Sequence, residues 1–413
     1  MHSYPVVVVG AGQAGVSVSR QLQVRGIEHV VLERGRVGET WRTQRWESFR
    51  VNTPNWCNGL PGLDFPGEPH HFPSAAELFG YLERYAAEFQ LPIHQGVAVT
   101  AVDRLEDGFA VQTDHPDFAA VQTRAVVLAS GSQNRPRVPA AAVQLPETIV
   151  QIHAGAYRNP AALPPRAVLV VGSAQSGCQI AEDLLAAGRR VYLSVSKVGR
   201  APRRYRGRDI LEWFLETGFF GMRPADLPDP ALQFVPQPQV SGVGEYGHTV
   251  SLQDLARQGV TLVGRFEGVD DGALAFDDSV AECVRFSDTG SAEIRQLIDG
   301  YLARQGSTPP PLEPDPADEP CVDPEALAGP GTIDAGSVGA VVWTTGFEGD
   351  FSWVHLPISD ERGRAIHRDG IAPVPGVFFV GLPWLRTRSS GVLPGVGPDA
   401  IVIAAAVAEH LGG

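Results

Sequence analysis

Two short glycine-rich stretches carry residue types that bind phosphate groups. The first, VVVVGAGQAG, spans Val6–Gly15, and the second, VVGSAQSGCQ, spans Val170–Gln179. In both, an apolar run leads into a turn of small residues, and a helix-compatible stretch follows. Such a turn presents backbone N–H groups and the positive end of a helix to a phosphate. The chain therefore offers two candidate nucleotide-binding turns.

The first turn has the full G-x-G-x-x-G spacing, with Gly10, Gly12 and Gly15. The first glycine permits a tight turn, the second lets the backbone approach a pyrophosphate, and the third lets the helix pack closely on the strand. Glu33 follows 23 residues after Gly10, at the end of the apolar run HVVLE, where a carboxylate can accept hydrogen bonds from a ribose. This combination predicts a dinucleotide site, and an unliganded structural turn is the alternative.

The second turn keeps the outer glycines, Gly172 and Gly177, and has Ala174 in the middle place. The next apolar run does not end in an acid. It is followed by hydroxyl and basic side chains, which are Ser194, Ser196, Lys197, Arg200, Arg203, Arg204, Arg206 and Arg208. An acid would select a ribose hydroxyl, whereas hydroxyls and cations suit a 2′-phosphate. We expect an NADPH-selective pocket with Lys197, Arg200 and Arg204 as contacts; a solvated basic face is the alternative.

Two dinucleotide turns in one chain predict two redox cofactors, FAD on the first unit and NADPH on the second. The second turn lies in the middle of the sequence, and strand-like runs continue after it. We therefore expect an NADPH-binding domain, residues 156–324, inserted into a split FAD-binding domain made of residues 1–155 and 325–413.

Apolar runs without period-2 alternation indicate parallel strands that are buried on both faces. Helical periodicity is present at 74–89 and again around Ile294–Leu302. The expected fold class is α/β with two Rossmann-like dinucleotide-binding domains. The runs that we interpret as strands are 6–9, 125–130, 167–171, 340–345 and 376–381.

The composition excludes several classes of protein. A formal net charge of −14 argues against a nucleic-acid partner. We expect no membrane association, because no apolar run has the roughly 18 residues of a spanning helix, and the start of the chain lacks signal-peptide features. Four cysteines stand far apart, at Cys57, Cys178, Cys283 and Cys321. We expect reduced thiols in a cytoplasmic protein and no metal site.

The segment from Pro309 to Pro330 is rich in proline and carboxylates and poor in large apolar residues. Such a stretch does not form a regular element. A surface excursion is one interpretation, and a cover over a ligand cleft is the other.

Five motifs resemble those of the class B flavin-dependent monooxygenases, within the two-dinucleotide-binding flavoproteins. GETWRTQRWESFRVNTPNW (38–56) resembles the G-G-T-W segment and the aromatic-Glu-Ser-Leu-Arg-x-Asn-Ser-Pro segment that follows it. LASGSQNRPRVP (128–139) resembles the A-T-G hinge, and VVWTTGF (341–347) resembles F-A-T-G-Y. HAGAYRNP (153–160) resembles the linker between domains, and FFVGLPWLRTRSSGVLPGVGPDA (378–400) resembles the closing element at the flavin ring.

The resemblance implies a mechanism and a set of site residues. NADPH would reduce the flavin, dioxygen would form a C4a-hydroperoxide, and one oxygen atom would pass to a small organic substrate. Asn52 falls on the family's asparagine beside the reactive edge of the flavin, so it is the candidate catalytic residue. The positions that we expect to contact the cofactors are Gly10, Gly12, Gln13, Ala14, Gly15, Glu33, Arg34, Trp41, Arg42, Arg45, Trp46, Thr53, Val99, Gly131, Gly172, Ala174, Gln175, Ser176, Ser194, Lys197, Arg200, Arg204, Thr345, Gly346 and Gly381.

Some of these roles have structural alternatives. The tryptophans Trp41, Trp46 and Trp56 could wall a flavin site or could pack in the core. Arg42 and Arg45 could contact the flavin or could be ordinary surface charges. For these five residues the sequence leaves both interpretations open.

One motif departs from the family pattern. The monooxygenase fingerprint has Phe and Gly six and four residues before the linker histidine, where this chain has Glu147 and Ile149 before His153. The Baeyer–Villiger variant has Trp four residues after that histidine, and this chain has Tyr157. The departure keeps two rivals open: an NADPH-dependent flavin reductase that passes electrons to a quinone or a redox partner, and a non-catalytic flavin-binding sensor.

The disulfide-reductase branch of the superfamily needs a cysteine pair near the flavin, which the cysteine spacing excludes. The expected partners are a small-molecule substrate and O2, and a homodimer is left open.

Overall fold

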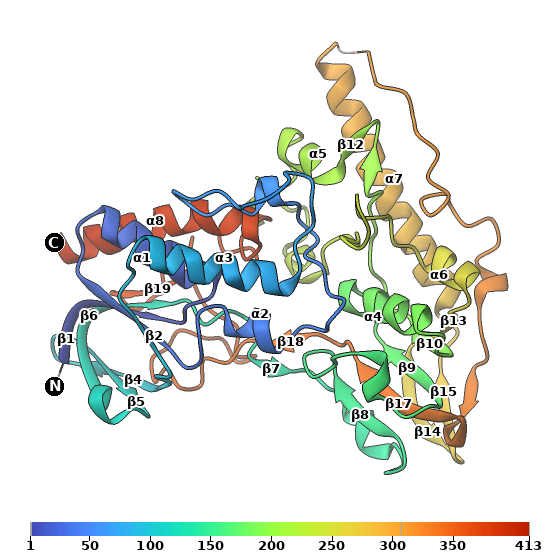
Figure 1. Cartoon of the computed structure of the whole chain (residues 1–413), viewed down its shortest axis with the longest axis horizontal. Helices are drawn as coiled ribbons and strands as arrows, with labels where there is room; N and C mark the ends of the chain where they lie inside the picture. Colours follow the sequence, from blue (N-terminus) through green and yellow to red (C-terminus); the bar gives the residue numbers. More distant parts are fainter. Residues whose placement is uncertain (1, 307, 413) are drawn as a thin grey trace.

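The computed structural model describes residues 2–306 and 308–412 and contains two α/β units placed side by side (Figure 1). Both chain ends lie at the far end of the first unit. The expected fold class, with two Rossmann-like units, is confirmed.

The first unit is built on a parallel sheet of order β3-β2-β1-β6, with β19 pairing the second half of β6. Two further strands, β5 and β4, continue from β6 as an antiparallel meander. The strands are β1 (His2–Val9), β2 (His29–Glu33), β3 (Ile93–Gln95), β4 (Val99–Leu105), β5 (Gly108–Thr113), β6 (Ala120–Leu128) and β19 (Val377–Phe379). The helices are α1 (Gln13–Val24), α2 (Glu39–Thr43), α3 (Ala75–Glu88) and α8 (Leu393–Gly412).

The all-valine run of β1 explains why this strand lies at the centre of the sheet. Val6 and Val8 are fully buried on the side of α1 and α8, and Val7 is fully buried on the opposite side, toward the meander. A strand covered on both faces needs apolar residues at every position. Helix α3 begins where predicted, because Ser74 and Glu77 form a reciprocal capping box.

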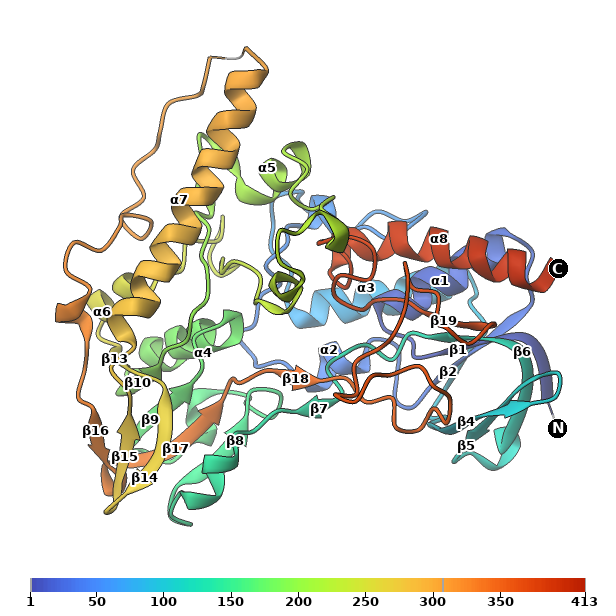
Figure 2. The same cartoon turned by 180° about the vertical axis from the view of Figure 1, so that it is seen from behind.

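The second unit repeats this plan with a five-stranded parallel sheet of order β13-β10-β9-β17-β8. Helices cover one face, and a second antiparallel meander covers the other, as Figure 2 shows from behind. The strands are β8 (Val150–His153), β9 (Ala167–Val171), β10 (Val191–Ser194), β13 (Thr261–Val263), β17 (Val338–Trp343), and the meander β14 (Phe266–Asp270), β15 (Ala273–Phe276) and β16 (Thr332–Asp334). The helices are α4 (Gln175–Ala186), α5 (Ile210–Glu216), α6 (Leu252–Gln258) and α7 (Val280–Arg304).

Two small ribbons and several short turns complete the fold. β7 (Arg135–Pro136) pairs with β18 (Phe347–Glu348) between the two units, and β11 (Arg204–Tyr205) pairs with β12 (Arg208–Asp209). The 3₁₀ turns are Asn55–Cys57, Pro116–Phe118, Ala140–Gln144, Pro160–Ala162, Pro224–Asp226, Pro230–Phe234, Glu325–Leu327 and Ala335–Ser337.

All five runs interpreted as strands are strands, but one of them, β17, and the additional strand β8 change the domain boundaries. β8 and β17 pair with each other, and β17 also pairs with β9, so both strands lie in the second sheet. The predicted limits at residues 155 and 325 assign these strands to the first unit. We therefore propose that the chain crosses between the units at about residues 131–149 and 344–348, where β7 meets β18.

Over the described ranges, no helix combines the length and the apolar character needed to cross a bilayer. All four cysteines are free thiols.

Candidate active site

The first glycine turn has one open position and two closed ones. Gly10 has φ +103°, and a Cβ placed on it would lie 2.8 Å from the carbonyl oxygen of Ala129. A Cβ on Gly15 would lie 1.8 Å from the carbonyl oxygen of Gly10. A Cβ on Gly12 would meet no atom within 4 Å. Gly10 and Gly15 are thus required by the turn itself, whereas the space beside Gly12 is free for a ligand.

Glu33 closes the far side of this turn. It is buried, and its carboxylate accepts hydrogen bonds from the N–H groups of Ala11 (2.7 Å) and Gly35 (2.8 Å). The carbonyl oxygen of Glu33 also accepts from the N–H of Val97 (2.8 Å). Val97 therefore lies beside Glu33. The predicted contact, Val99, pairs with Thr113 on β5, and its contact with a cofactor stays a prediction.

Trp41 and Arg45 flank the start of α1. The indole Nε1 of Trp41 donates to the Oε1 of Gln13 (2.8 Å), and the guanidinium of Arg45 lies 4.5 Å from the centre of the Trp41 ring. Arg45 also donates to Gln133 (3.2 Å), two residues beyond the hinge glycine Gly131. Burial lowers the pKa of Arg45 to about 10. These side chains lie next to the helix end that a pyrophosphate would contact.

Two of the residues predicted to contact the cofactors, Arg42 and Trp46, contact side chains of the protein itself. Arg42 forms an ion pair with Glu83 (2.6 Å) and covers the ring of Phe79 at 3.7 Å, so its guanidinium is engaged by α3. Trp46 is 5% exposed and packs edge-on against Phe49, in the core. Arg34, by contrast, is exposed in the loop after Glu33.

The loop that carries Asn52 is bonded to the second unit. The Oδ1 of Asn52 accepts from the Nε2 of Gln179 on α4 (2.9 Å), and its carbonyl oxygen accepts from the Nη1 of Arg203 (2.8 Å). The hydroxyl of Thr53 donates to Asn58 within the loop (2.5 Å). Asn52 thus lies where the two units meet.

The second glycine turn has the same geometry as the first. Gly172 has φ +105°, and a Cβ on Gly177 would lie 1.9 Å from the carbonyl oxygen of Gly172. Ala174, at the start of α4, has the same extended conformation as Gly12 at the start of α1. The predicted contact Gln175 is engaged elsewhere, because its amide accepts from the N–H of Val240 (3.1 Å) and donates to the carbonyl oxygen of that residue (2.5 Å). Ser176 follows it, half-buried in the first turn of α4.

Equivalent hydrogen bonds align the two units residue by residue. The N–H of Gly10 donates to the carbonyl oxygen of Leu32 (2.8 Å), and the N–H of Gly172 donates to that of Ser194 (2.9 Å). Glu33 therefore corresponds to Val195, an apolar residue. The next residue, Ser196, accepts from the N–H of Ser173 at 3.4 Å through its hydroxyl.

The alignment corrects the predicted role of Ser194. Its side chain is buried and joins β10 to the meander, because it donates to the carbonyl oxygen of Gly264 (2.9 Å) and accepts from the N–H of Phe266 (3.1 Å). The residues at the tip of the strand are Ser196 and Lys197.

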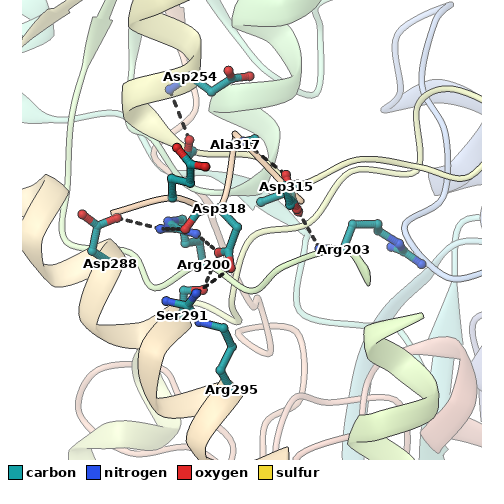
Figure 3. A network of polar contacts seen from close by, with 12 residues as sticks. Arg200, Arg203, Asp254, Asp288, Ser291, Arg295, Asp315, Ala317 and Asp318 are labelled. Atoms are coloured by element: carbon teal, nitrogen blue, oxygen red, sulfur yellow. Dashed lines mark hydrogen bonds and ion pairs between the residues drawn. The ribbon is translucent and has the colours of Figure 1, made fainter. Parts of the chain in front are cut away.

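Two arginines of the basic cluster, Arg200 and Arg203, are buried inside the protein (Figure 3). Arg200 is fully buried and pairs with Asp288 (2.7 Å) and with Asp318. The prediction that Arg200 binds a 2′-phosphate is therefore wrong for this structure, because two carboxylates already surround its guanidinium. Arg204 is exposed and donates to the carbonyl oxygen of Gly207 (2.7 Å), in the β11–β12 turn. Lys197 is about half exposed and pairs with Glu282 (2.6 Å).

The proline- and acid-rich segment, residues 309–330, is the partner of this basic cluster. It runs back along α7 (Figure 1). Arg206 donates to the carbonyl oxygen of Pro310 (2.7 Å), Arg257 donates to that of Pro316 (2.7 Å), and Asp315 accepts from Thr249 (2.6 Å). The carboxylate of Asp318 in this segment also pairs with the buried Arg200, so the segment is bonded both to the basic cluster and to α6. We call this segment the strap.

His153 contacts the 341–347 motif where the chain crosses between the two units. Its Nε2 donates to the carbonyl oxygen of Gly346 (2.9 Å), and its Nδ1 accepts from the N–H of Gly155 (3.2 Å). Burial lowers the pKa of His153, which favours this neutral form. Thr345 donates to the carbonyl oxygen of Arg137, across the same crossing. The histidine and the threonine–glycine pair therefore hold the two units together.

The closing element returns to the first glycine turn. Gly381 has φ +83°, and a Cβ placed on it would lie 2.5 Å from the Cβ of Ala14. Only glycine allows the chain after β19 to approach the start of α1 so closely.

Both dinucleotide turns fit an anionic ligand. Neither α1 nor α4 has an acidic residue in its first turn, and among the described residues no side chain caps either helix. The first turn adds the open space beside Gly12 and the carboxylate of Glu33, a donor set that suits the pyrophosphate and ribose of FAD. The second turn adds a small residue, Ala174, and no acid, which suits a nucleotide with a 2′-phosphate.

Sequence reasoning missed three residues of this site: Val97, Gln179 and Val195. It named Ser196 after the second apolar run but did not choose it as a contact. The position of Val195 could have been found by aligning the two units from their glycines. Val97 and Gln179 are placed by contacts between distant segments, which leave no local signal.

Comparisons with known proteins agree with this geometry. The profile of the pyridine nucleotide-disulphide oxidoreductase family matches residues 7–211, which include both turns. An uncharacterized oxidoreductase, CzcO-like, of Geobacillus kaustophilus is 29% identical over 413 residues, covering 99% of each chain. Indole-3-pyruvate monooxygenase YUCCA1 of Oryza sativa subsp. japonica is 27% identical over 307 residues, covering 71% of this chain and 75% of that protein.

A solved structure shares the fold. The flavin-containing monooxygenase of Stenotrophomonas maltophilia is 19% identical and covers 99% of both chains, with a TM-score of 0.67. In its two glycine turns and in these comparisons, the chain is similar to the class B flavin-dependent monooxygenases, within the two-dinucleotide-binding flavoproteins.

Proposed function

We propose that this protein is an FAD-dependent, NADPH-consuming monooxygenase that transfers one oxygen atom from O2 to a small organic substrate. The observation that carries the proposal is the position of Asn52. Its loop belongs to the first unit, but its side chain is bonded to α4, the helix that begins at the second glycine turn. A residue that joins the unit with the first glycine turn to the helix that follows the second suits a reaction in which both cofactors act on one substrate.

The overall reaction balances as NADPH, a proton, O2 and substrate giving NADP⁺, water and oxygenated substrate. When bound, FAD supplies the redox chemistry, accepting hydride from NADPH and activating dioxygen. The protein binds and orients the cofactors and the substrate, and it excludes water from the site. Glu33 and the start of α1 would hold the FAD ribose and pyrophosphate, Trp41 and Arg45 would cover that end of the site, and Asn52 would donate a hydrogen bond at the reacting edge.

The preference for NADPH would come from the tip of β10. Val195 stands where the first unit has its ribose-binding acid, so no carboxylate repels a 2′-phosphate there. Ser196 offers a hydroxyl, and Lys197 offers a cation that a phosphate would take over from Glu282. We therefore place the phosphate contacts at Ser196 and Lys197 rather than at Arg200.

A substrate screen tests the proposal. FAD-loaded protein is supplied with NADPH and with thioethers, amines or ketones, the classes that an oxygen-activating flavin oxidises. NADPH consumption and hydrogen peroxide release are followed together. A true substrate should speed NADPH consumption and suppress peroxide release, because the oxygen atom goes into product. If every compound leaves consumption matched by peroxide, the proposal is contradicted.

The departure around His153 supports a second candidate, an NADPH-dependent flavin reductase that passes electrons to a quinone or a redox partner. Glu147 and Ile149 replace the fingerprint residues, and Ile149 is only 3% exposed, within the core of the second unit. A reductase would turn over rapidly with a quinone in the absence of oxygen and would couple no substrate oxygenation. Steady NADPH consumption by the purified protein would exclude the third possibility, a sensor without turnover.

A further inference from the structure

Asn52 is held from the second unit at both its side chain and its backbone. Gln179, which is 4% exposed, donates its Nε2 to the side-chain oxygen of Asn52. Arg203, which is 2% exposed, donates to the main-chain carbonyl of the same residue. The two contacts have different consequences for the asparagine.

The contact with Gln179 determines which end of the amide faces away from α4. A carboxamide has an oxygen that only accepts and an NH2 group that only donates. With Oδ1 bonded to Gln179, the Nδ2 of Asn52 is the end left for a ligand. The flavin would therefore meet a donor.

The contact with Arg203 fixes the position of the loop rather than the orientation of the amide. The guanidinium is paired with Asp209 (2.5 Å) and lies 4.3 Å from the centre of the Phe72 ring. The N–H of Arg203 donates to Thr249, which in turn donates to Asp315 of the strap (Figure 3). Because this attachment does not involve Gln179, a change at Gln179 should turn the amide without moving the backbone.

Gln179 also lies one turn along α4 from Gln175, at the nucleotide-binding end of the helix. Any shift of α4 when the nucleotide binds would be transmitted directly to the Asn52 side chain.

We propose that Gln179 is a positioning residue that orients the Asn52 amide, so that its NH2 group donates toward the bound flavin, and that links this orientation to the nucleotide-binding unit. The proposal deepens the function proposed above and rests on it.

The test uses Gln179→Glu in the full-length, FAD-loaded protein. An ionised carboxylate only accepts, so Asn52 must turn its NH2 group toward it and present its oxygen to the flavin. After NADPH-reduced protein is mixed with O2, an absorbing species that is neither oxidised nor reduced flavin should decay about tenfold faster than in the wild type, as expected for one lost hydrogen bond. Lowering the pH should restore the lifetime, because a protonated carboxyl donates again.

Two further variants separate orientation from packing and charge. Gln179→Met removes the hydrogen bond without imposing an orientation, so its effect should be smaller, about threefold, and independent of pH. Gln305→Glu adds a charge at the exposed end of α7 and should leave the lifetime unchanged. A merely structural role for Gln179 would predict that the Met variant is as impaired as the Glu variant, with no recovery in acid.

A second readout keeps the two proposals distinguishable. The difference spectrum that NADP⁺ induces in bound, oxidised FAD needs no reaction with oxygen. Gln179→Glu should change this spectrum in a pH-dependent way. If the wild type shows no oxygen-dependent species, the proposed function fails while the spectrum still tests Gln179. If lifetime and spectrum match those of the wild type at every pH, the proposal for Gln179 is overturned.

Discussion

Replacing Arg200 by Met should destabilise the protein without changing its choice of nucleotide. Arg200 is fully buried, and its loss removes the cation that pairs with Asp288 and one of the two guanidinium groups that pair with Asp318. Breaking a buried pair by removing one partner costs about 3–5 kcal/mol. Asp318 keeps the hydroxyl of Ser291 (2.5 Å) and the guanidinium of Arg295 (3.4 Å), so we expect the lower end, about 3 kcal/mol.

Urea unfolding of the FAD-loaded variant measures this effect. With a slope of about 3 kcal/mol per molar urea, the midpoint should fall by about 1 M. The ratio of the Michaelis constants for NADPH and NADH should stay as in the wild type. The double variant Arg200→Met/Asp318→Leu should lose less than the sum of the single losses, because it leaves no orphan carboxylate at Asp318. Arg204→Met, at an exposed site, should change stability by no more than about 0.5 kcal/mol.

The opposite outcome for Arg200 would refute this reasoning. If Arg200→Met left the urea midpoint unchanged and selectively raised the Michaelis constant for NADPH, the buried ion pairs would not describe the protein in solution.

Three further predictions concern the two glycine turns and the crossing between the two units. Lys197→Ala should raise the Michaelis constant for NADPH about fivefold and leave that for NADH unchanged, because only the 2′-phosphate would contact this partly exposed cation; an equal change for both nucleotides would count against it. Gly12→Val should fold with a normal circular dichroism spectrum but purify without the yellow colour of FAD. Gly15→Ala should instead lower the melting temperature, because its Cβ would overlap the carbonyl of Gly10. A yellow Gly12→Val protein would contradict FAD binding at the first glycine turn. Burial lowers the pKa of His153, so the unfolded chain takes up its proton first, and stability should fall as the pH drops from about 6.5 through the lower folded pKa. His153→Gln keeps a donor for Gly346 and should make that fall shallower in urea titrations at pH 5 to 7; an unchanged slope would mean that His153 does not contribute.

Local patterns were sufficient to predict the strands and the glycine turns. Every valine of β1 is needed because both faces of the strand are covered, so burial is visible in the sequence itself. The capping box at Ser74 is equally local, and α3 begins where expected. Fold class therefore followed from short-range features.

The ion pairs and the domain limits depend on contacts between residues that are far apart in the sequence, and these could not be predicted from local patterns. Arg200 meets Asp318 across 118 residues, and nothing near Arg200 indicates that its partner lies in the strap. We propose other domain limits than those expected from the sequence, because β17 could join either sheet until its pairing with β8 and β9 was known. The role of Ser194 was misplaced because its carbonyl bonds to Gly172 as that of Leu32 bonds to Gly10, so that the residue equivalent to Glu33 is Val195 and not Ser194.

The most direct test of the central claim is the reaction of the reduced protein with oxygen. FAD-loaded protein is reduced by NADPH without air, then mixed rapidly with O2 in the presence of NADP⁺ while the flavin absorbance is recorded. Juxtaposed flavin and nucleotide sites that exclude water predict a distinct absorbing species that persists before oxidised flavin returns. A single-phase return to oxidised flavin, with peroxide released from the start, would contradict the account.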